Sequence, residues 1–253
     1  MKYAVIALLV MTLSVPALAH DVDVELVIAT DVSASISGTE GLIQRQGVAA
    51  AFRSQGVVNA IRAGRLGKIG AAYMEWSDSP SVNVPVGWTV IGDHASAVAF
   101  ADAIEAAPRI TGSGTAIGTA LVAALNLIET NNLEGARRVV DVSGDGLSNS
   151  GLPLRQAREM VIAAGVIING LPVLTDEADR PDIDAYYRAC VIGGIGAFAI
   201  SARGFQEFAQ VIRRKFVLEI SQDRPVLTRV AFAPMSKWTG GCEESAVQRY
   251  APP

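Results

Sequence analysis

Apolar residues recur along this chain with two different periods, and segments with one period alternate with segments with the other. Short apolar runs rich in β-branched residues, such as VDVELVIAT at 22–30, indicate strands. Longer stretches with apolar residues three and four positions apart indicate helices, because that spacing puts them on one helical face. The pattern predicts strands at 22–30, 136–146, 166–174 and 196–202, a hairpin at 68–92, and helices at 38–64, 93–107, 115–131, 152–165, 182–191 and 204–221.

Strands therefore alternate with helices through most of the sequence. Several of the strands are continuous apolar runs, which are typical of parallel sheets covered on both faces. The turn signal SDSP divides the segment 68–92 and predicts an antiparallel hairpin. We expect an α/β fold, a Rossmann-like three-layer sandwich. Its central sheet is mostly parallel with one antiparallel edge hairpin, and helices cover both faces.

The first 19 residues have a pattern that differs from the helix and strand patterns of the rest of the chain. One Lys precedes an apolar stretch that ends in Ala-Leu-Ala at 17–19, a pattern typical of a signal peptide. A membrane anchor is the alternative, but a span needs about 20 apolar residues and this stretch is shorter. We expect an exported protein, periplasmic or secreted, that begins at His20. Its domain would cover residues 20–221, followed by a tail at 222–253.

The composition of the chain further limits the class of protein to which it can belong. Of the 253 residues, 50% are hydrophobic and 18% are charged, which is enough apolar surface for a sizeable core. The net charge of −4 comes without a basic cluster, so nucleic acid is not an expected partner. In an oxidising compartment Cys190 and Cys242 most simply form a disulfide that ties back the tail. Two free buried thiols are the alternative, and zinc would need more ligands than these cysteines and two scattered histidines supply.

Polar residues cluster where ligands of open α/β sheets usually bind, at the carboxyl ends of strands. They occur in three motifs, DVSAS, TGSGTAIGTAL and VSGDG, and the candidate ligands are Asp31, Ser33, Ser35, Thr115 and Asp145. Carboxylate and hydroxyl oxygens suit Mg²⁺, with Mn²⁺ or Ca²⁺ as alternatives, better than they suit zinc or copper. Taken singly, each residue could instead cap a helix or form a turn.

The three motifs resemble the metal-ion-dependent adhesion site of von Willebrand factor type A domains. VIATDVSASIS resembles that family's D-x-S-x-S motif, GSGTAIGTAL its threonine loop, and VVDVSGDG its aspartate loop. The resemblance covers about residues 22–218. The family more often has Thr before its aspartate, where this chain has Gly144, and that difference affects hydrogen bonding around the ligand. YYRACVIGGIGAF and IRRKFVLEI also resemble an exported bacterial family with this domain whose function is not established.

The resemblance implies a role for each candidate residue. Ser33 and Ser35 would bind the metal directly. Asp31 and Asp145 would bind it directly or through water. Thr115 would join when the carboxylate of a partner arrives.

The implied function is a non-enzymatic, divalent-metal-dependent module that binds an Asp or Glu of a partner protein. Specificity would lie in the loops ISGTE, SDSPS, GLSNSGLP and TDEADRP. One alternative is a scaffold whose metal is structural or absent. Another is a Mg²⁺-dependent hydrolase or phosphotransferase, which the missing P-loop lysine and missing G-x-S-x-G motif disfavour. A copper site at His20 and His94 would need the fold to bring the two together.

Overall fold

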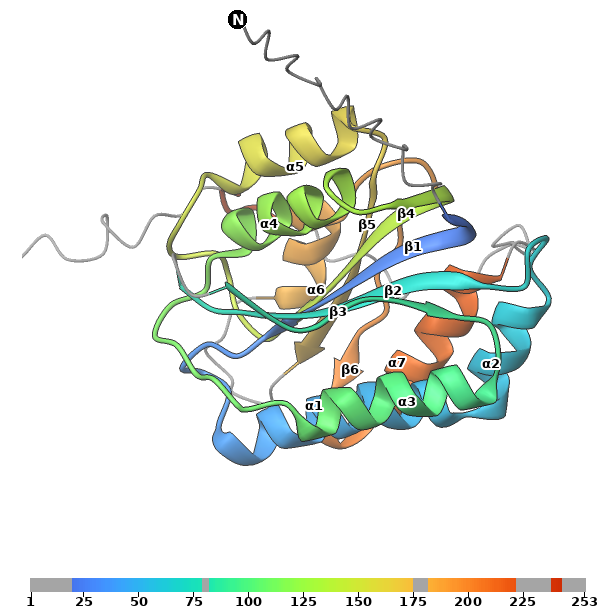
Figure 1. Ribbon diagram of the computed structural model, residues 1–253. Helices are drawn as coiled ribbons and strands as arrows, with labels where there is room; N and C mark the ends of the chain where they lie inside the picture. Colours follow the sequence, from blue (N-terminus) through green and yellow to red (C-terminus); the bar gives the residue numbers. More distant parts are fainter. Residues whose placement is uncertain (1–19, 79–81, 175–181, 222–237, 243–253) are drawn as a thin grey trace, which may run out of the picture.

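A six-stranded sheet runs through the part of the chain that the computed structural model describes, residues 20–78, 82–174, 182–221 and 238–242 (Figure 1). The strand order is β3-β2-β1-β4-β5-β6, and only the β2–β3 pair is antiparallel. The predicted α/β class with one antiparallel edge is therefore confirmed. The strands are β1 (His20–Asp31), β2 (Ile69–Trp76), β3 (Val82–Ile91), β4 (Leu133–Gly144), β5 (Ile167–Leu174) and β6 (Ala202–Arg203).

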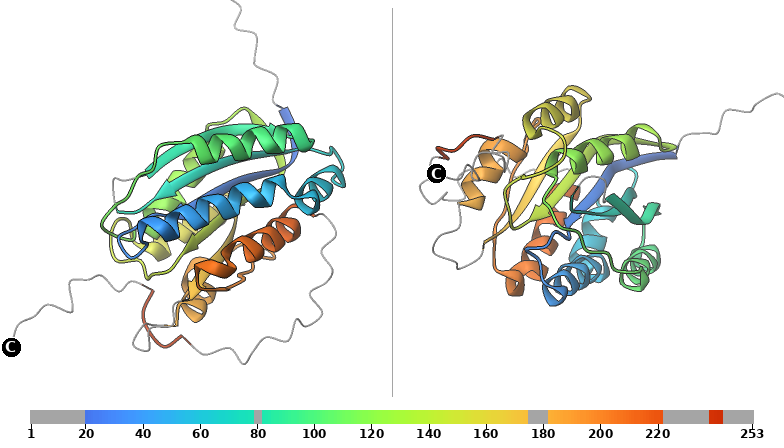
Figure 2. Two further views of the ribbon diagram at one scale, coloured as in Figure 1. Left: turned by 90° about the horizontal axis from the view of Figure 1, so that it is seen from below. Right: turned by 90° about the vertical axis from the view of Figure 1, so that its left-hand side faces the viewer.

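Helices cover both faces of this sheet (Figures 1 and 2). One face carries α1 (Gly38–Arg53), α2 (Gln55–Arg62), α3 (His94–Ala106) and α7 (Phe205–Ile220). The other carries α4 (Ile117–Glu129), α5 (Leu154–Ala163), α6 (Ile183–Tyr186) and the π-helix η1 (Tyr187–Val191). The three-layer sandwich predicted from the sequence is thus the observed architecture.

The central strand β1 explains why the core is divided in two. Val24, Leu26 and Ile28 pack into the layer of α1, α2, α3 and α7. Val27 and Ala29 pack into the layer of α4, α5 and α6. Successive side chains of a strand point to opposite faces, so a strand buried on both faces is apolar at nearly every position.

The predicted helix over 38–64 is wrong in one respect, because it is two helices. Ser54 separates α1 from α2 with an extended backbone, φ −75° and ψ 140°. Its hydroxyl donates to Ala51 O at 2.6 Å and accepts from Val57 N at 3.4 Å. One serine therefore ends the first helix and caps the second, because its side chain replaces backbone partners lost at a helix end.

The predicted strand over 196–202 is mostly not a strand. β6 contains only Ala202 and Arg203, and Ala199 adds one isolated bridge to Gly170. Gly194 and Gly196 have φ values of 92° and 73°, which interrupt an extended chain. The helix predicted over 182–191 is present, as α6 continued directly by the π-helix η1.

The predicted disulfide joins Cys190 of η1 to Cys242, with 5.4 Å between the two Cα atoms. The same short tail segment places the Trp238 ring edge-on to Tyr186, with ring centroids 5.3 Å apart. The predicted signal segment and most of the predicted tail lie outside the described residues, so those boundaries stay predictions. Within the described ranges, no helix has the length and apolar character needed to cross a membrane.

Candidate metal site

The two candidate carboxylates come from adjacent parallel strands. Asp31 is the last residue of β1, and Asp145 directly follows the last residue of β4. The strands are in register near these ends, where Thr30 lies opposite Ser143. Their carboxyl ends therefore meet at one edge of the sheet, and this brings together two motifs that are more than 100 positions apart in the sequence.

A continuous series of hydrogen bonds connects the D-x-S-x-S loop to Asp145. Ser33 N donates to Asp31 Oδ1 at 2.7 Å. The hydroxyls of Ser33 and Ser35 lie 3.2 Å apart. Ser35 Oγ then donates to Asp145 Oδ1 at 2.6 Å. Four of the five predicted residues thus form one polar cluster.

The fifth residue, Thr115, is placed beside this cluster by the loop that follows Asp145. Thr115 N donates to the side-chain oxygen of Asn149 at 2.8 Å, and Asn149 N donates back to Thr115 O at 2.9 Å. Thr115 Oγ1 lies 3.6 Å from the place a Cβ would take on Gly146. The threonine hydroxyl is therefore next to the Asp145 loop. No pattern in the sequence indicated that Asn149 would make this link.

The site is buried except on one side. Asp31, Ser33, Thr115 and Asp145 have exposed fractions of 0, 1, 5 and 1%. Ser35 is exposed. An incoming group would therefore reach the cluster on the side of Ser35.

Asp31 carries the strongest electrostatic signal of the site. The pKa of its carboxyl is raised from 3.8 to about 8, mainly by burial; hydrogen bonds from Ser33 act to lower this pKa, and the charge of Asp145 acts to raise it. Asp31 Oδ2 is buried and has no hydrogen-bond partner within the described part of the chain. A buried carboxylate oxygen without a partner is costly, and a bound cation would remove that cost.

The donor set fits a hard divalent cation. It consists of two carboxylates and three hydroxyls, all oxygen, as Mg²⁺, Mn²⁺ and Ca²⁺ prefer. Across the described ranges, no group of three or more His, Cys, Asp and Glu side chains is placed to hold a metal ion. His20 starts β1 and His94 starts α3, so neither belongs to the cluster at the carboxyl end of β1.

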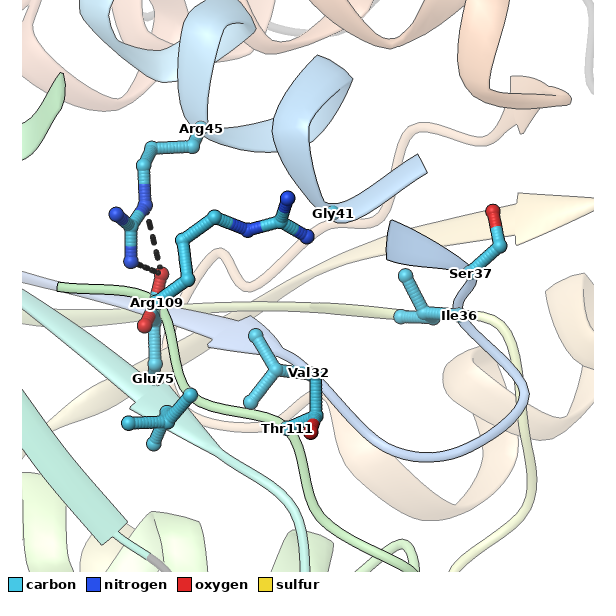
Figure 3. Close-up of a pocket in the computed structure, with 9 residues that line it drawn as sticks. Val32, Ile36, Ser37, Gly41, Arg45, Glu75, Arg109 and Thr111 are labelled. Atoms are coloured by element: carbon cyan, nitrogen blue, oxygen red, sulfur yellow. Dashed lines mark hydrogen bonds and ion pairs between the residues drawn. The ribbon is translucent and has the colours of Figure 1, made fainter. Parts of the chain in front are cut away.

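A shallow pocket lies beside the D-x-S-x-S loop (Figure 3). Arg45 forms its inner wall and pairs with Glu75 at 2.6 Å, with both side chains only 3% exposed. The exposed Arg109 lies at the rim and donates to Gly38 O at 2.5 Å. The pocket is lined by Val32, Ile36, Ser37, Gly41, Arg45, Glu75, Arg109, Ile110 and Thr111. Part of the predicted specificity loop ISGTE therefore borders it.

The other predicted specificity loops are described to different extents. GLSNSGLP follows Asp145 and supplies the Asn149 contact to Thr115. SDSPS lies partly outside the described residues, and TDEADRP lies entirely outside them.

The fold is that of von Willebrand factor type A domains. One similar structure is proximal thread matrix protein 1 of the mussel byssus, with a zinc-occupied MIDAS motif. The TM-score is 0.53 and the identity is 17%, and the match covers 81% of this chain and 49% of that one. A von Willebrand factor type A protein from Catenulispora acidiphila is similar with a TM-score of 0.54 at 17% identity, over 79% of this chain and 43% of that one. The type V pili tip protein Mfa5 of Porphyromonas gingivalis is similar in its vWF domain with a TM-score of 0.52 at 11% identity, over 82% of this chain and 99% of that one. This chain thus spans about half or less of the first two.

The chain belongs to the family described as "Protein of unknown function (DUF1194)", whose model matches residues 21–224. No curated protein matches it.

Proposed function

We propose that this protein is an exported, non-enzymatic module that binds a partner protein through a divalent metal ion. Asp31, Ser33, Ser35, Thr115 and Asp145 would hold the metal, with Mg²⁺ as the expected ion. When bound, the metal supplies a coordination position for an Asp or Glu carboxylate of the partner.

The observation that carries the proposal is the arrangement of Asp31. Its Oδ2 is buried and finds no hydrogen-bond partner among the described residues, inside a cluster that also contains Asp145. Two buried carboxylates so close to each other repel, and a divalent cation is the simplest group that would neutralise both. The similar mussel protein has a zinc-occupied MIDAS motif, which supports a divalent ion in this chain as well.

Two features support an acidic partner. Ser35 is exposed, so the cluster can be reached from outside. Arg109 is exposed at the rim of the neighbouring pocket, where a cation would favour an approaching carboxylate. The pilus tip protein among the similar structures is consistent with a binding role.

The metal is tested first, by titrating purified, chelator-treated protein with Mg²⁺, Mn²⁺, Ca²⁺ and Zn²⁺ while following thermal unfolding. A ligand that binds only the folded state adds about 2.7 kcal/mol of stability at a hundredfold excess over Kd. Asp31→Ala and Ser35→Ala should lose this gain. Ser37→Ala is the matched control, since Ser37 is exposed and caps α1 two positions beyond Ser35. If wild-type protein gains nothing from any ion, the proposal is wrong and the scaffold alternative stands.

The partner chemistry is tested next with immobilised peptides that each carry one Glu, and with the same peptides carrying Gln instead. Binding should require both the metal and the Glu side chain. Equal binding to the Glu and Gln peptides, or binding that survives chelation, would overturn the carboxylate part of the proposal.

A further inference from the structure

In the described ranges, a second buried oxygen without a hydrogen-bond partner lies next to Asp31. It is the hydroxyl of Tyr187, the first residue of η1, whose side chain is fully buried. Isolated buried hydroxyls are costly, so an unpaired one beside an unpaired carboxylate oxygen calls for an explanation. Among the residues that the structure describes, neither oxygen has a hydrogen-bond partner, and both lie against the same backbone position.

That position is Gly144, the last residue of β4. Tyr187 Oη and Asp31 Oδ2 each lie 2.8 Å from the place where a Cβ on residue 144 would stand, and Asp31 Cβ lies at 3.2 Å. Any side chain there would displace one of the two oxygens. The glycine that precedes Asp145 therefore leaves space that the tyrosine hydroxyl and the Asp31 carboxylate share.

A second glycine admits the ring of the same tyrosine. A Cβ on Gly170 of β5 would lie 2.8 Å from Tyr187 Cδ1. Gly170 is opposite Val142 on the neighbouring strand β4, two residues before Gly144. Tyr187 thus lies across two adjacent strands, each of which has a glycine where the tyrosine crosses it. Such a fit indicates that the position of the hydroxyl, and not only the volume of the ring, matters to this site.

We propose that Tyr187 is a positioning residue of the metal site, and that its hydroxyl donates a hydrogen bond to Asp31 Oδ2 when the site is loaded. The bond would orient the carboxylate toward the ligands Ser33 and Asp145. In this chain the supporting hydroxyl would come from η1, across the sheet edge, and not from the residue before Asp145. This inference rests on the proposed metal site.

The test is Mn²⁺ affinity, measured by calorimetry and by the electron paramagnetic resonance signal of free Mn²⁺. Loss of a hydrogen bond to a metal-binding carboxylate typically lowers metal affinity about 10- to 100-fold, and we expect Tyr187→Phe to fall in that range. The stability of the metal-free variant should not fall, because Phe fills the same volume and removes an unpaired hydroxyl. A hydroxyl that matters only to the fold would give the reverse pattern, lower stability and unchanged affinity.

Tyr73→Phe is the matched control. Tyr73 is also fully buried, and its hydroxyl donates to a carboxylate, Glu75 Oε1, at 3.0 Å. This contact is outside the candidate ligand set, so the control should lose stability while its Mn²⁺ affinity stays within a factor of about two of the wild-type value.

Gly144→Ala tests the same geometry if Tyr187→Phe does not fold. Its methyl group would lie 2.8 Å from both oxygens, so it should weaken Mn²⁺ binding even though Tyr187 remains. Wild-type affinity in a folded Tyr187→Phe or Gly144→Ala variant would overturn the role of Tyr187 and leave the proposed function intact. A wild-type protein that binds no Mn²⁺ would overturn both.

Discussion

Removing the charge of Asp31 should change how the stability of the metal-free protein depends on pH. Burial raises the pKa of this carboxyl from 3.8 to about 8. Between these values the folded chain keeps a proton that the unfolded chain has released. Unfolding then releases a proton, so the free energy of unfolding decreases as pH rises, by about 1.4 kcal/mol per pH unit. Below pH 3.8 the destabilisation disappears, and above about 8 it is complete.

The size of the Asp31 contribution to the free energy of unfolding follows from the width of the pH interval that is compared. From pH 5 to pH 8 the contribution of Asp31 amounts to at most about 4 kcal/mol, since water entry reduces the penalty of a buried charge. Glu219 contributes with the same sign, because burial and then the charge of Asp141 raise its pKa to about 8. Asp31→Asn removes only the first contribution, so the comparison of variant with wild type isolates Asp31.

The assay is urea unfolding of chelator-treated protein at pH 5 and pH 8. Asp31→Asn should gain stability relative to wild type as pH rises, by an amount approaching 4 kcal/mol. Saturating Mn²⁺ should remove the Asp31 contribution to the pH dependence of wild type, because the metal replaces the proton, and should leave the Glu219 contribution in place. The exposed helix cap Asp93 provides the control variant Asp93→Asn, which should keep the wild-type pH dependence. If wild type and Asp31→Asn differ by the same amount at both pH values, the carboxyl is not protonated in the folded state and the reasoning fails.

Two further changes test the rest of the structure. The disulfide joins Cys190 to Cys242, which are 52 positions apart in the sequence. Its reduction should lower the free energy of unfolding by about 4 kcal/mol in the chain-entropy model, seen as a lower unfolding temperature with reductant. An unchanged temperature would mean that the bond between the tail and η1 contributes nothing to stability. Lys215→Met should cost about 3–5 kcal/mol in urea unfolding above pH 8, where Glu219 is charged, because Lys215 is fully buried between Asp141 and Glu219 and its loss leaves both carboxylates without their cation. A loss below 1 kcal/mol at that pH would contradict the buried ion pairs.

The pattern of apolar residues predicted the class of fold and most of its elements. β1 and β5 could be recognised because a strand buried on both faces must be apolar at nearly every position. Helix ends were less predictable. The break at Ser54 depends on a hydroxyl that serves two helices at once, and the apolar spacing continues through it. The short β6 depends on glycine conformations that no spacing reveals.

The order of residues along the chain was enough to identify the side chains that can form the candidate site. Asp31, Ser33 and Ser35 follow the first strand, and Asp145 follows another, so a parallel sheet brings them to one edge wherever the helices lie. The surroundings of these side chains depend on how distant segments pack in the folded chain. Tyr187 reaches Asp31 from an element more than 150 residues away, because two glycines on adjacent strands leave room for its ring and its hydroxyl. Local periodicity carries information about the backbone near each residue, whereas such contacts depend on the packing of distant segments, which no local pattern encodes.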